Sequence, residues 1–89
     1  MIVEFDHAKD ATNRQKHGFS LAEAARLDLD QATVVPDERS DYGEVRFQAY
    51  GVLDGRLYVL AFTMRGVTLR AISFRKANKR GERRYGRRP

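Results

Sequence analysis

The side chains in this chain that could do chemistry are mainly the arginines and lysines of its C-terminal part. Residues 65–89 carry ten basic side chains and one acidic one, whereas residues 1–64 carry seven basic and eleven acidic ones. The planar guanidinium group of arginine presents a fork of donors that matches a phosphate group. This distribution of charge favours a polyanionic partner such as nucleic acid. A solvated basic tail, or a tail that docks on an acidic protein, is the alternative.

Other kinds of reactive site find little support in the sequence. The chain has no cysteine, so it has neither a disulfide framework nor a thiolate nucleophile. It also lacks the sequence patterns of zinc proteases, phosphate-binding loops and serine hydrolases. His7 and His17 are ten residues apart, which is not a familiar spacing of metal ligands. The sequence therefore predicts no metal and no cofactor.

Cleavage of RNA is a reaction that needs neither metal nor cofactor. The 2′-hydroxyl of the RNA can itself attack the adjacent phosphorus, so the protein must align that attack, stabilise the charged phosphorane and move two protons. Arginines on a rigid sheet suit the second task, and tyrosine, lysine or histidine side chains can serve the third. His17 could transfer a proton, but its position just before Gly18 is also typical of a residue that ends a helix.

Targeting signals are not evident in the sequence. The opening residues, 1–6, contain no basic segment of the kind that begins a secretory signal. The longest largely apolar run, residues 57–64, is too short to span a bilayer. We therefore expect a cytoplasmic protein.

The elements that must position the reactive side chains indicate an α+β fold in one domain. Local patterns predict strands at 2–5, 32–35, 44–53, 56–64 and 67–74. They predict helices at 7–17 and from 20, and a basic helix and tail at about 78–89. Asp6 is expected to cap the first helix and Gly18 to end it, while Ser20 and Glu23 are expected to form a capping box. The order β-α-α-β-β-β-β-α favours a mostly antiparallel twisted sheet covered by helices.

Two tight turns determine the expected registers of this sheet. Asp54-Gly55 and Arg65-Gly66 are each expected to supply the two residues of a hairpin loop. Arg46 and Arg70 then lie in adjacent rows of one sheet face, within a few ångströms of each other. Two like charges at that separation favour a bound phosphate, although Glu44 and water could also satisfy them.

The other end of the same sheet face is expected to be apolar and exposed. Its members are Tyr50, Val52, Leu57, Val59, Ile72 and Phe74. The final helix offers only Ala77 and Tyr85 as apolar cover, and a contiguous apolar patch on a small protein usually marks an interaction site. We therefore expect a partner protein to dock on Tyr50, Leu57, Val59, Ile72 and Phe74.

Three segments of the chain resemble the BrnT-like toxins. They are Phe5-Asp6-x-x-Lys9-x-x-x-Asn13-x-x-Lys16-His17-Gly18, then Gly43-Glu44-x-Arg46-Phe47-x-x-x-Gly51, and finally Arg70-x-Ile72-Ser73-x-Arg75-Lys76-Ala77-Asn78 with the later Arg84-Tyr85. Together they run from residue 5 to residue 85, so the resemblance covers essentially the whole chain. Two positions depart from the family pattern: Phe5 stands where the family usually has tryptophan, and Gly81 where it usually has an acid.

The resemblance implies a RelE-like fold and a metal-independent endoribonuclease toxin of a type II toxin–antitoxin pair, with RNA as its substrate. The implied partner is a BrnA-like ribbon-helix-helix antitoxin, and operator DNA would be bound only through that antitoxin. The expected catalytic side chains are Arg46, Arg70, Arg75, Lys9, His17 and Tyr85, the last three as candidates for proton transfer. The expected RNA-binding side chains are Lys76, Lys79, Arg80, Arg83 and Arg84.

Arg70 and Arg75 lie on the same predicted strand but have opposite parity, so they point to opposite faces of a regular strand. Both can reach one site only if the strand ends or bends between them. Two other functions remain open at this stage. One is a non-catalytic nucleic-acid-binding module, and the other is a structural partner of a DNA-binding antitoxin.

Overall fold

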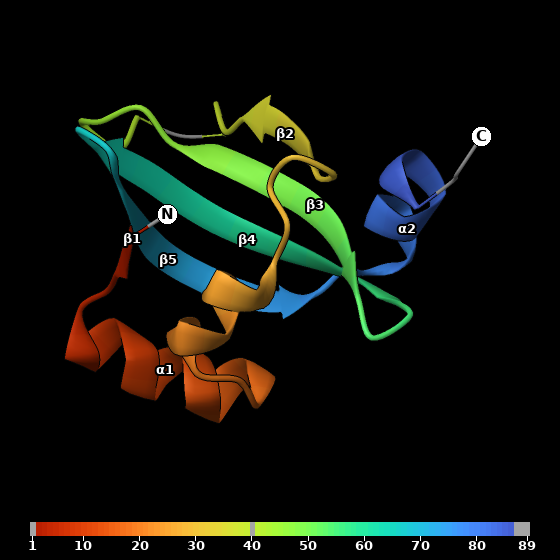
Figure 1. The fold of residues 1–89 in the computed structure, drawn as a ribbon, viewed down its shortest axis with the longest axis horizontal. Coiled ribbons are helices and arrows are strands. Elements are labelled where there is room, and N and C mark those ends of the chain that lie inside the picture. The colour runs from red at the N-terminus through yellow and green to blue at the C-terminus, as the bar shows by residue number, and fades with distance from the viewer. Residues whose placement is uncertain (1, 40, 87–89) are drawn as a thin grey trace.

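The computed structural model of the chain describes residues 2–39 and 41–86. Its elements are β1 (Ile2–Glu4), α1 (His7–His17), the 3₁₀ helix η1 (Leu21–Arg26), β2 (Thr33–Pro36), β3 (Phe47–Leu53), β4 (Arg56–Arg65), β5 (Thr68–Lys76) and α2 (Lys79–Tyr85). The α+β class is confirmed, whereas the second helix is a 3₁₀ helix (Figure 1). The end of the expected basic tail, residues 87–89, lies outside the described residues.

The five strands form one mixed sheet in the order β1-β5-β4-β3-β2. β2, β3, β4 and β5 pair with their neighbours antiparallel, whereas β1 pairs parallel with β5. β1 covers only the first part of β5, from Thr68 to Arg70. The remaining edge of β5 is therefore open to contact from another element.

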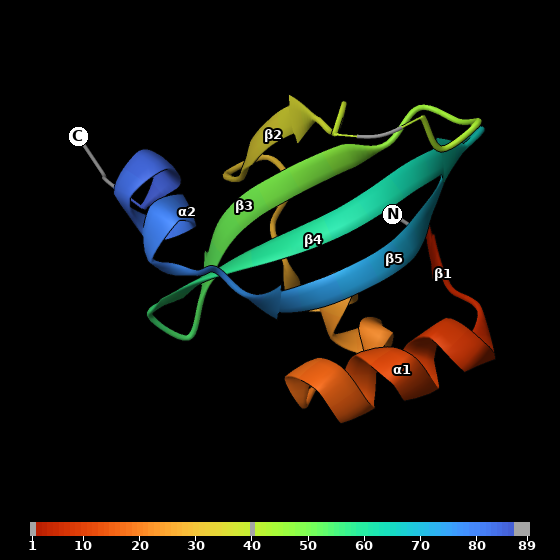
Figure 2. The same ribbon diagram turned by 180° about the vertical axis from the view of Figure 1, so that it is seen from behind.

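One face of the sheet holds the core, and the other is left largely uncovered by helices. η1 lies across the first face, and the fully buried side chains there include Leu21, Leu60, Leu69 and Phe74 (Figure 1). Seen from behind, β3, β4 and β5 present a face that no helix crosses, with α2 at one end and α1 along the β5 side (Figure 2). We call this second surface the open face.

Helix α1 begins and ends as its sequence predicts. Asp6 Oδ1 accepts hydrogen bonds from the backbone N–H groups of Ala8 at 2.7 Å and Lys9 at 3.2 Å, and Gly18 ends the helix with φ 83°. The helix has almost no apolar side chain to bury, and it packs instead through polar ones. Asn13 is only 3% exposed, because its carboxamide lies against the open edge of β5.

The expected capping box of Ser20 and Glu23 does not form, and Asp10 of α1 bonds to the start of η1. Asp10 Oδ1 accepts the backbone N–H of Leu21 at 2.6 Å and the hydroxyl of Ser20 at 3.0 Å. These bonds, the first of them above all, hold the pKa of Asp10 below its usual range. Glu23 pairs with Arg26 at 2.9 Å rather than with the start of the helix. Ser20 still caps the segment, because its Oγ accepts the N–H of Ala22 at 3.1 Å, and the segment is a short 3₁₀ helix.

The two hairpins differ in how well their turns predict their registers. The register between β3 and β4 is the expected one, with Leu53 opposite Arg56. In the second hairpin Arg65 pairs with Thr68, so the loop is Gly66-Val67 and the expected Arg65-Gly66 loop is wrong. Gly66 has φ 60°, and a turn with glycine at its first central position matches the twist of the strands.

A β-bulge in β5 changes the face on which its second half lies. Ala71 pairs with Phe62 and Ser73 pairs with Ala61, so Ile72 has no partner on β4. Because strand side chains alternate between faces, one extra residue reverses the orientation of everything after it. This bulge is therefore the bend that allows Arg70 and Arg75, at the two ends of β5, to lie on the same face of the sheet.

Two consequences of the bulge correct the sequence-based expectations. Phe74 pairs with Leu60 and is 0% exposed in the core, so its assignment to an exposed docking patch is wrong. Arg75 pairs with Val59 and lies on the open face. Ile72 is half-buried and lies beside α1 rather than in the apolar patch.

The rest of the expected apolar patch is covered within the chain except for Val52, which is 46% exposed. Leu57 is 5% exposed and Val59 is 2% exposed, so neither forms the exposed docking surface that was predicted. Tyr85 of α2 stacks on the half-buried Tyr50, with ring centroids 4.1 Å apart. A Cβ atom on Gly81 would lie 3.3 Å from the Tyr50 ring, so a glycine here lets α2 approach the sheet closely. The helix covers the sheet with its backbone, although it has few apolar side chains.

Candidate nucleic-acid cleft

A cleft of about 290 Å³ lies between α2 and the open face of the sheet. β3, β5, α2 and the loop after β2 all contribute to it, and its lining residues are Arg39, Gln48, Tyr50, Arg75, Asn78, Arg80, Gly81, Arg84 and Tyr85. Four of these nine residues are arginines, and none of the nine is acidic. We call this site the arginine cleft. Such a surface attracts anions, because low-dielectric walls strengthen the field of like charges that line them.

Arg75 reaches the cleft because of the bulge in β5. Its Nη1 donates to the carbonyl oxygen of the neighbouring Lys76 at 3.3 Å. Among the described residues, no carboxylate lies within ion-pair distance of Arg75. Its remaining donors are therefore available to a ligand.

Helix α2 supplies two further arginines to the same cleft. Asn78 caps the helix as expected, with its Oδ1 accepting the N–H of Gly81 at 2.8 Å. Arg80 and Arg84 are four residues apart, so they lie on one side of the helix. Neither has a carboxylate partner in the part of the chain that the structure describes. Glu82 points elsewhere, 3.6 Å from Arg56.

Arg39 comes from the loop between β2 and β3 and was not predicted as a site residue. Its Nε and Nη2 donate to the two carboxylate oxygens of Asp37, each at 2.8 Å. The side chain of Asp37 is 1% exposed, whereas that of Arg39 is 65% exposed. Arg39 also holds the pKa of Asp37 below its usual range. A buried carboxylate thus fixes one edge of the guanidinium and leaves the other edge free in the cleft.

Replacing Asp37 by asparagine tests this arrangement. Asp37→Asn is expected to lower the free energy of unfolding by roughly 1–2 kcal/mol near pH 7, because one partner is buried and the other is largely exposed. The folded-state pKa of Asp37 is depressed, so the stabilisation is complete above the usual value near 3.8 and is lost as the pH falls through the folded value. Urea denaturation at several pH values measures the difference. Glu38→Gln, at the exposed neighbouring acid, is the control, and an equal loss in both variants would contradict the assignment.

Two stacked tyrosines form one wall of the cleft. The rings of Tyr50 and Tyr85 are inclined by 24°, and the Tyr50 hydroxyl donates to Gln48 Oε1 at 3.0 Å. Burial raises the pKa of Tyr50 above its usual value, so its hydroxyl stays protonated at neutral pH. The guanidinium carbon of Arg84 lies 5.6 Å from the centroid of the Tyr85 ring. Tyr85, an expected catalytic residue, thus lines the same cleft as Arg75, and Gln48 is a lining residue that was not predicted.

Arg46 and Arg70 lie outside this cleft, and each has an acidic neighbour. Arg46 Nε is 3.0 Å from Glu44, and its guanidinium stacks over Tyr42 at 4.0 Å. Arg70 Nη1 is 2.7 Å from Glu4 on β1. For Arg46 this matches the alternative left open by the sequence, in which Glu44 satisfies the charge.

Lys9 and His17 lie in a separate groove of about 310 Å³ between α1 and the edge of β5. This α1 groove is lined by Ala8, Lys9, Thr12, Asn13, Lys16, His17, Ile72 and Ser73. Burial lowers the pKa of His17 below its usual value, and the charges of Arg75 and Lys16 lower it further. Ser73 of this groove and Arg75 of the arginine cleft are two residues apart on β5, so the α1 groove adjoins the cleft on the β5 side.

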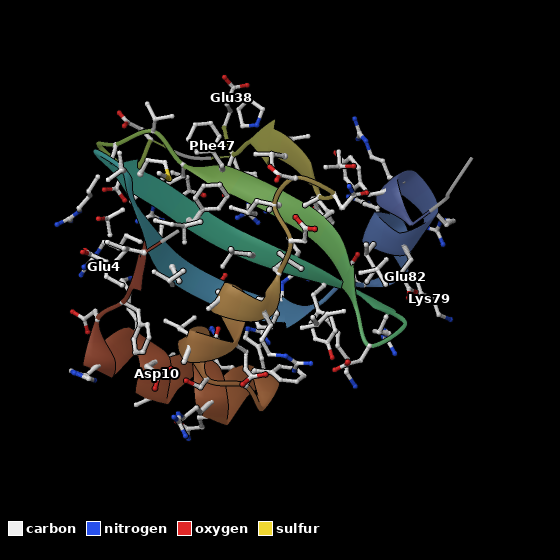
Figure 3. All side chains as sticks on the ribbon, viewed as in Figure 1. Glu4, Asp10, Glu38, Phe47, Lys79 and Glu82 are labelled. Atoms are coloured by element: carbon white, nitrogen blue, oxygen red, sulfur yellow. The ribbon has the colours of Figure 1, made fainter. Side chains whose placement is uncertain are left out.

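The other basic residues of the predicted RNA-binding set lie away from the arginine cleft. Lys79 and Arg83 line a hollow on another side of α2, together with Glu82. Figure 3 shows Lys79 and Glu82 at the end of the molecule opposite Glu4. Lys76 is exposed and pairs with Tyr58, so it belongs to the other face of β5. Only Arg80 and Arg84 of this set reach the cleft.

No group of three or more histidine, cysteine, aspartate or glutamate side chains in 2–39 and 41–86 is arranged to hold a metal ion. No helix in the same residues is long and apolar enough to cross a membrane.

Comparison with known proteins gives a matching family and a similar solved structure. A family model described as "Ribonuclease toxin, BrnT, of type II toxin-antitoxin system" matches residues 5–81. Among solved structures, the chain is similar to the ribonuclease toxin BrnT of Brucella abortus, known from a crystal structure at 1.1 Å resolution. That match has a TM-score of 0.69 and 27% sequence identity, and it covers 89% of this chain and 100% of the other. No curated protein matches the chain. Since the family model spans most of its length, the chain belongs to the BrnT family of ribonuclease toxins of type II toxin–antitoxin systems.

Proposed function

We propose that this chain is a metal-independent endoribonuclease that cleaves RNA in the arginine cleft and is neutralised by a cognate antitoxin. The observation that carries the proposal is the arginine cleft itself, which among the described residues is lined by four arginines and no acid. Family membership supports an RNA substrate and an antitoxin partner. We also propose that the reaction is of the RelE-like type and that the protein acts in the cytoplasm.

The first task of such an enzyme is to stabilise the negative charge of the transition state. When the 2′-hydroxyl attacks the phosphorus, negative charge builds up on the non-bridging oxygens of the phosphorane. Arg75, Arg80 and Arg84 line the cleft without acidic partners among the described residues, so their donors need not leave a carboxylate to meet that charge. Arg39 is oriented in advance by Asp37. We assign the reacting phosphate to these arginines and give Arg46 and Arg70 no contact with it.

The two proton transfers can be assigned from the protonation states of the groups nearby. A general base must be unprotonated at the working pH, and a general acid must be protonated. His17 has a lowered pKa, so its imidazole is neutral at pH 7 and suits the role of base. Tyr85 lines the arginine cleft together with Arg75, and we assign its hydroxyl the role of acid. Lys9 is eight residues from His17, about 12 Å along α1, and we assign it no proton transfer.

A pH profile tests the assignment of His17. The acid limb of kcat/KM for RNA cleavage is expected below pH 6.5, because the pKa of His17 is lowered. Lys16→Gln removes a positive charge that disfavours the imidazolium, so the pKa of His17 should rise and the acid limb should move to higher pH. Thr12→Ala, in the same groove, leaves the charge unchanged and is the control. An acid limb at the same pH in Lys16→Gln and in the wild type would exclude His17 as the base.

An antitoxin that blocks this site would have to mask the positive charge of the cleft. We propose a BrnA-like ribbon-helix-helix protein that places acidic side chains over the arginine cleft and that alone contacts operator DNA. The expected docking patch on Leu57, Val59 and Phe74 is excluded because these side chains are buried. The cleft and its rim are the more suitable surface, since occupying them would block RNA at the same time.

The direct test is incubation of the purified chain with RNA, with and without EDTA. Cleavage that persists in EDTA and leaves 2′,3′-cyclic phosphate ends would support metal-independent attack by the 2′-hydroxyl. RNA binding without cleavage would support the non-catalytic binding module instead. Expression with and without the neighbouring gene, with growth and RNA integrity as readouts, tests the antitoxin.

A further inference from the structure

The α1 groove has a composition that suits an anionic ligand, although it is distinct from the arginine cleft. Its lining residues include Lys9, Lys16 and His17, and none of them is acidic. Neither lysine has a carboxylate within ion-pair distance among residues 2–39 and 41–86. Lys9 and Lys16 are seven residues apart, so they lie on one side of α1 and both add to the positive field of the groove.

The groove is built by specific contacts rather than by chance exposure of lysines. Asn13 holds α1 at the open edge of β5 through bonds of 2.8 and 2.9 Å to the backbone of Phe74. Asp10 lies on the opposite flank of the helix, where it is bonded to Leu21 of η1. The acidic side chain of α1 is thus turned toward η1, and Lys9 and Lys16 remain on the flank that lines the groove.

A continuous surface connects this groove with the arginine cleft. Ser73 lines the groove and Arg75 lines the cleft, and the two are alternate residues on the same side of β5. Ser73 pairs with Ala61, which pairs in turn with Gln48 of the cleft. Neighbouring strands are about 4.8 Å apart, so this row spans about 10 Å across a floor that contains a single small side chain. A strand of RNA that leaves the arginine cleft along this row would reach the α1 groove.

We propose that the α1 groove is a second RNA subsite, which binds backbone phosphate of the strand that flanks the nucleotides in the arginine cleft. This inference rests on the proposed function. RNA is favoured over an acidic protein segment because the groove continues directly into the surface on which the scissile phosphate is proposed to lie. The affinity of an oligonucleotide that fills only the arginine cleft should not depend on the groove, whereas the affinity of a longer one should.

The test measures the affinity of 2′-O-methyl RNA, which binds but cannot be cleaved, as a function of salt. Lys9→Gln and Lys16→Gln should each make the slope of log K against log [salt] less steep by about 0.7, the value for one lost phosphate contact on a single strand. A dinucleotide should show no change. The measurements are made at about pH 8, where His17 is neutral in every variant. Arg65→Gln is the control for loss of one exposed positive charge, because Arg65 lies at the tip of the β4–β5 hairpin.

Two results would overturn the inference. One is a slope for the longer RNA that is the same in both lysine variants as in the wild type. The other is weaker binding of the antitoxin with unchanged binding of RNA, which would make the groove a protein-binding surface. Failure of the proposed function looks different, since the wild-type chain would then leave RNA intact whatever the lysine variants bind.

Discussion

Arg75→Ala is expected to lower kcat for RNA cleavage by about 10²–10³-fold while the fold remains intact. This is the usual cost of removing one preorganised donor to a developing negative charge, about 2.7–4 kcal/mol. The side chain has no carboxylate partner among the described residues, so its removal leaves no buried acid without a partner. Removal also reduces the repulsion between the arginines of the cleft. Single-turnover cleavage, together with urea denaturation to show that the variant is folded, gives both quantities.

Two further variants make the result specific for this arginine. Arg75→Lys keeps the charge but loses the fork of donors, so it should recover only part of the rate. Arg70 lies on the same strand, but its guanidinium is paired with Glu4 at 2.7 Å. Arg70→Ala therefore removes the same kind of side chain from a position that is already paired. Its kcat should fall far less than that of Arg75→Ala. Equal losses in the two alanine variants would show that the arginine cleft has not been correctly assigned as the reaction site.

Asn13→Leu is expected to lower the free energy of unfolding by about 3–5 kcal/mol, a large part of the stability of a small domain. The carboxamide of Asn13 donates to the carbonyl oxygens of Phe19 and Phe74, and its oxygen accepts the N–H of Phe74 at 2.9 Å. Phe74 is 0% exposed, so leucine of similar size would leave its two backbone groups buried without partners. Urea denaturation measures the change.

The neighbouring and conservative variants separate this cause from a general effect on the helix. Gln15→Ala, at an exposed position of α1, should change stability by less than about 0.5 kcal/mol. Asn13→Asp keeps an acceptor for the N–H of Phe74 but loses both donated bonds, so we expect it to be strongly destabilising as well. A stability of Asn13→Leu within 1 kcal/mol of the wild type, an order-of-magnitude threshold, would mean that water replaces the carboxamide.

Several features followed from the sequence because they depend on neighbours within a few residues. Asp6, Gly18 and Asn78 define helix ends through their own backbone angles and nearby N–H groups. Asp54-Gly55 sets the β3–β4 register, since both residues adopt the positive φ that the tight turn requires. The α+β class and the family resemblance also came from such short patterns. Each of these predictions is confirmed.

The arginine cleft could be predicted only in part, because its members come together through contacts that are distant in sequence. Arg75, Arg80, Arg84 and Tyr85 were expected site residues, and the structure brings them together. Arg39 has no distinguishing local pattern, since its position depends on the burial of Asp37.

The sequence by itself thus determined the local ends, the turns and the positive charge of the C-terminal part, whereas the tertiary structure decided which arginines face the same site. The partner of Arg70 is Glu4, which is 66 residues away along the chain. The bulge at Ile72 reverses the faces of Phe74 and Arg75, because strand side chains alternate with a period of two and one extra residue shifts all that follow. No residue type on that strand specifies where the extra residue falls. Just after the bulge, the backbone of Phe74 bonds to Asn13, which lies 61 residues earlier in the chain.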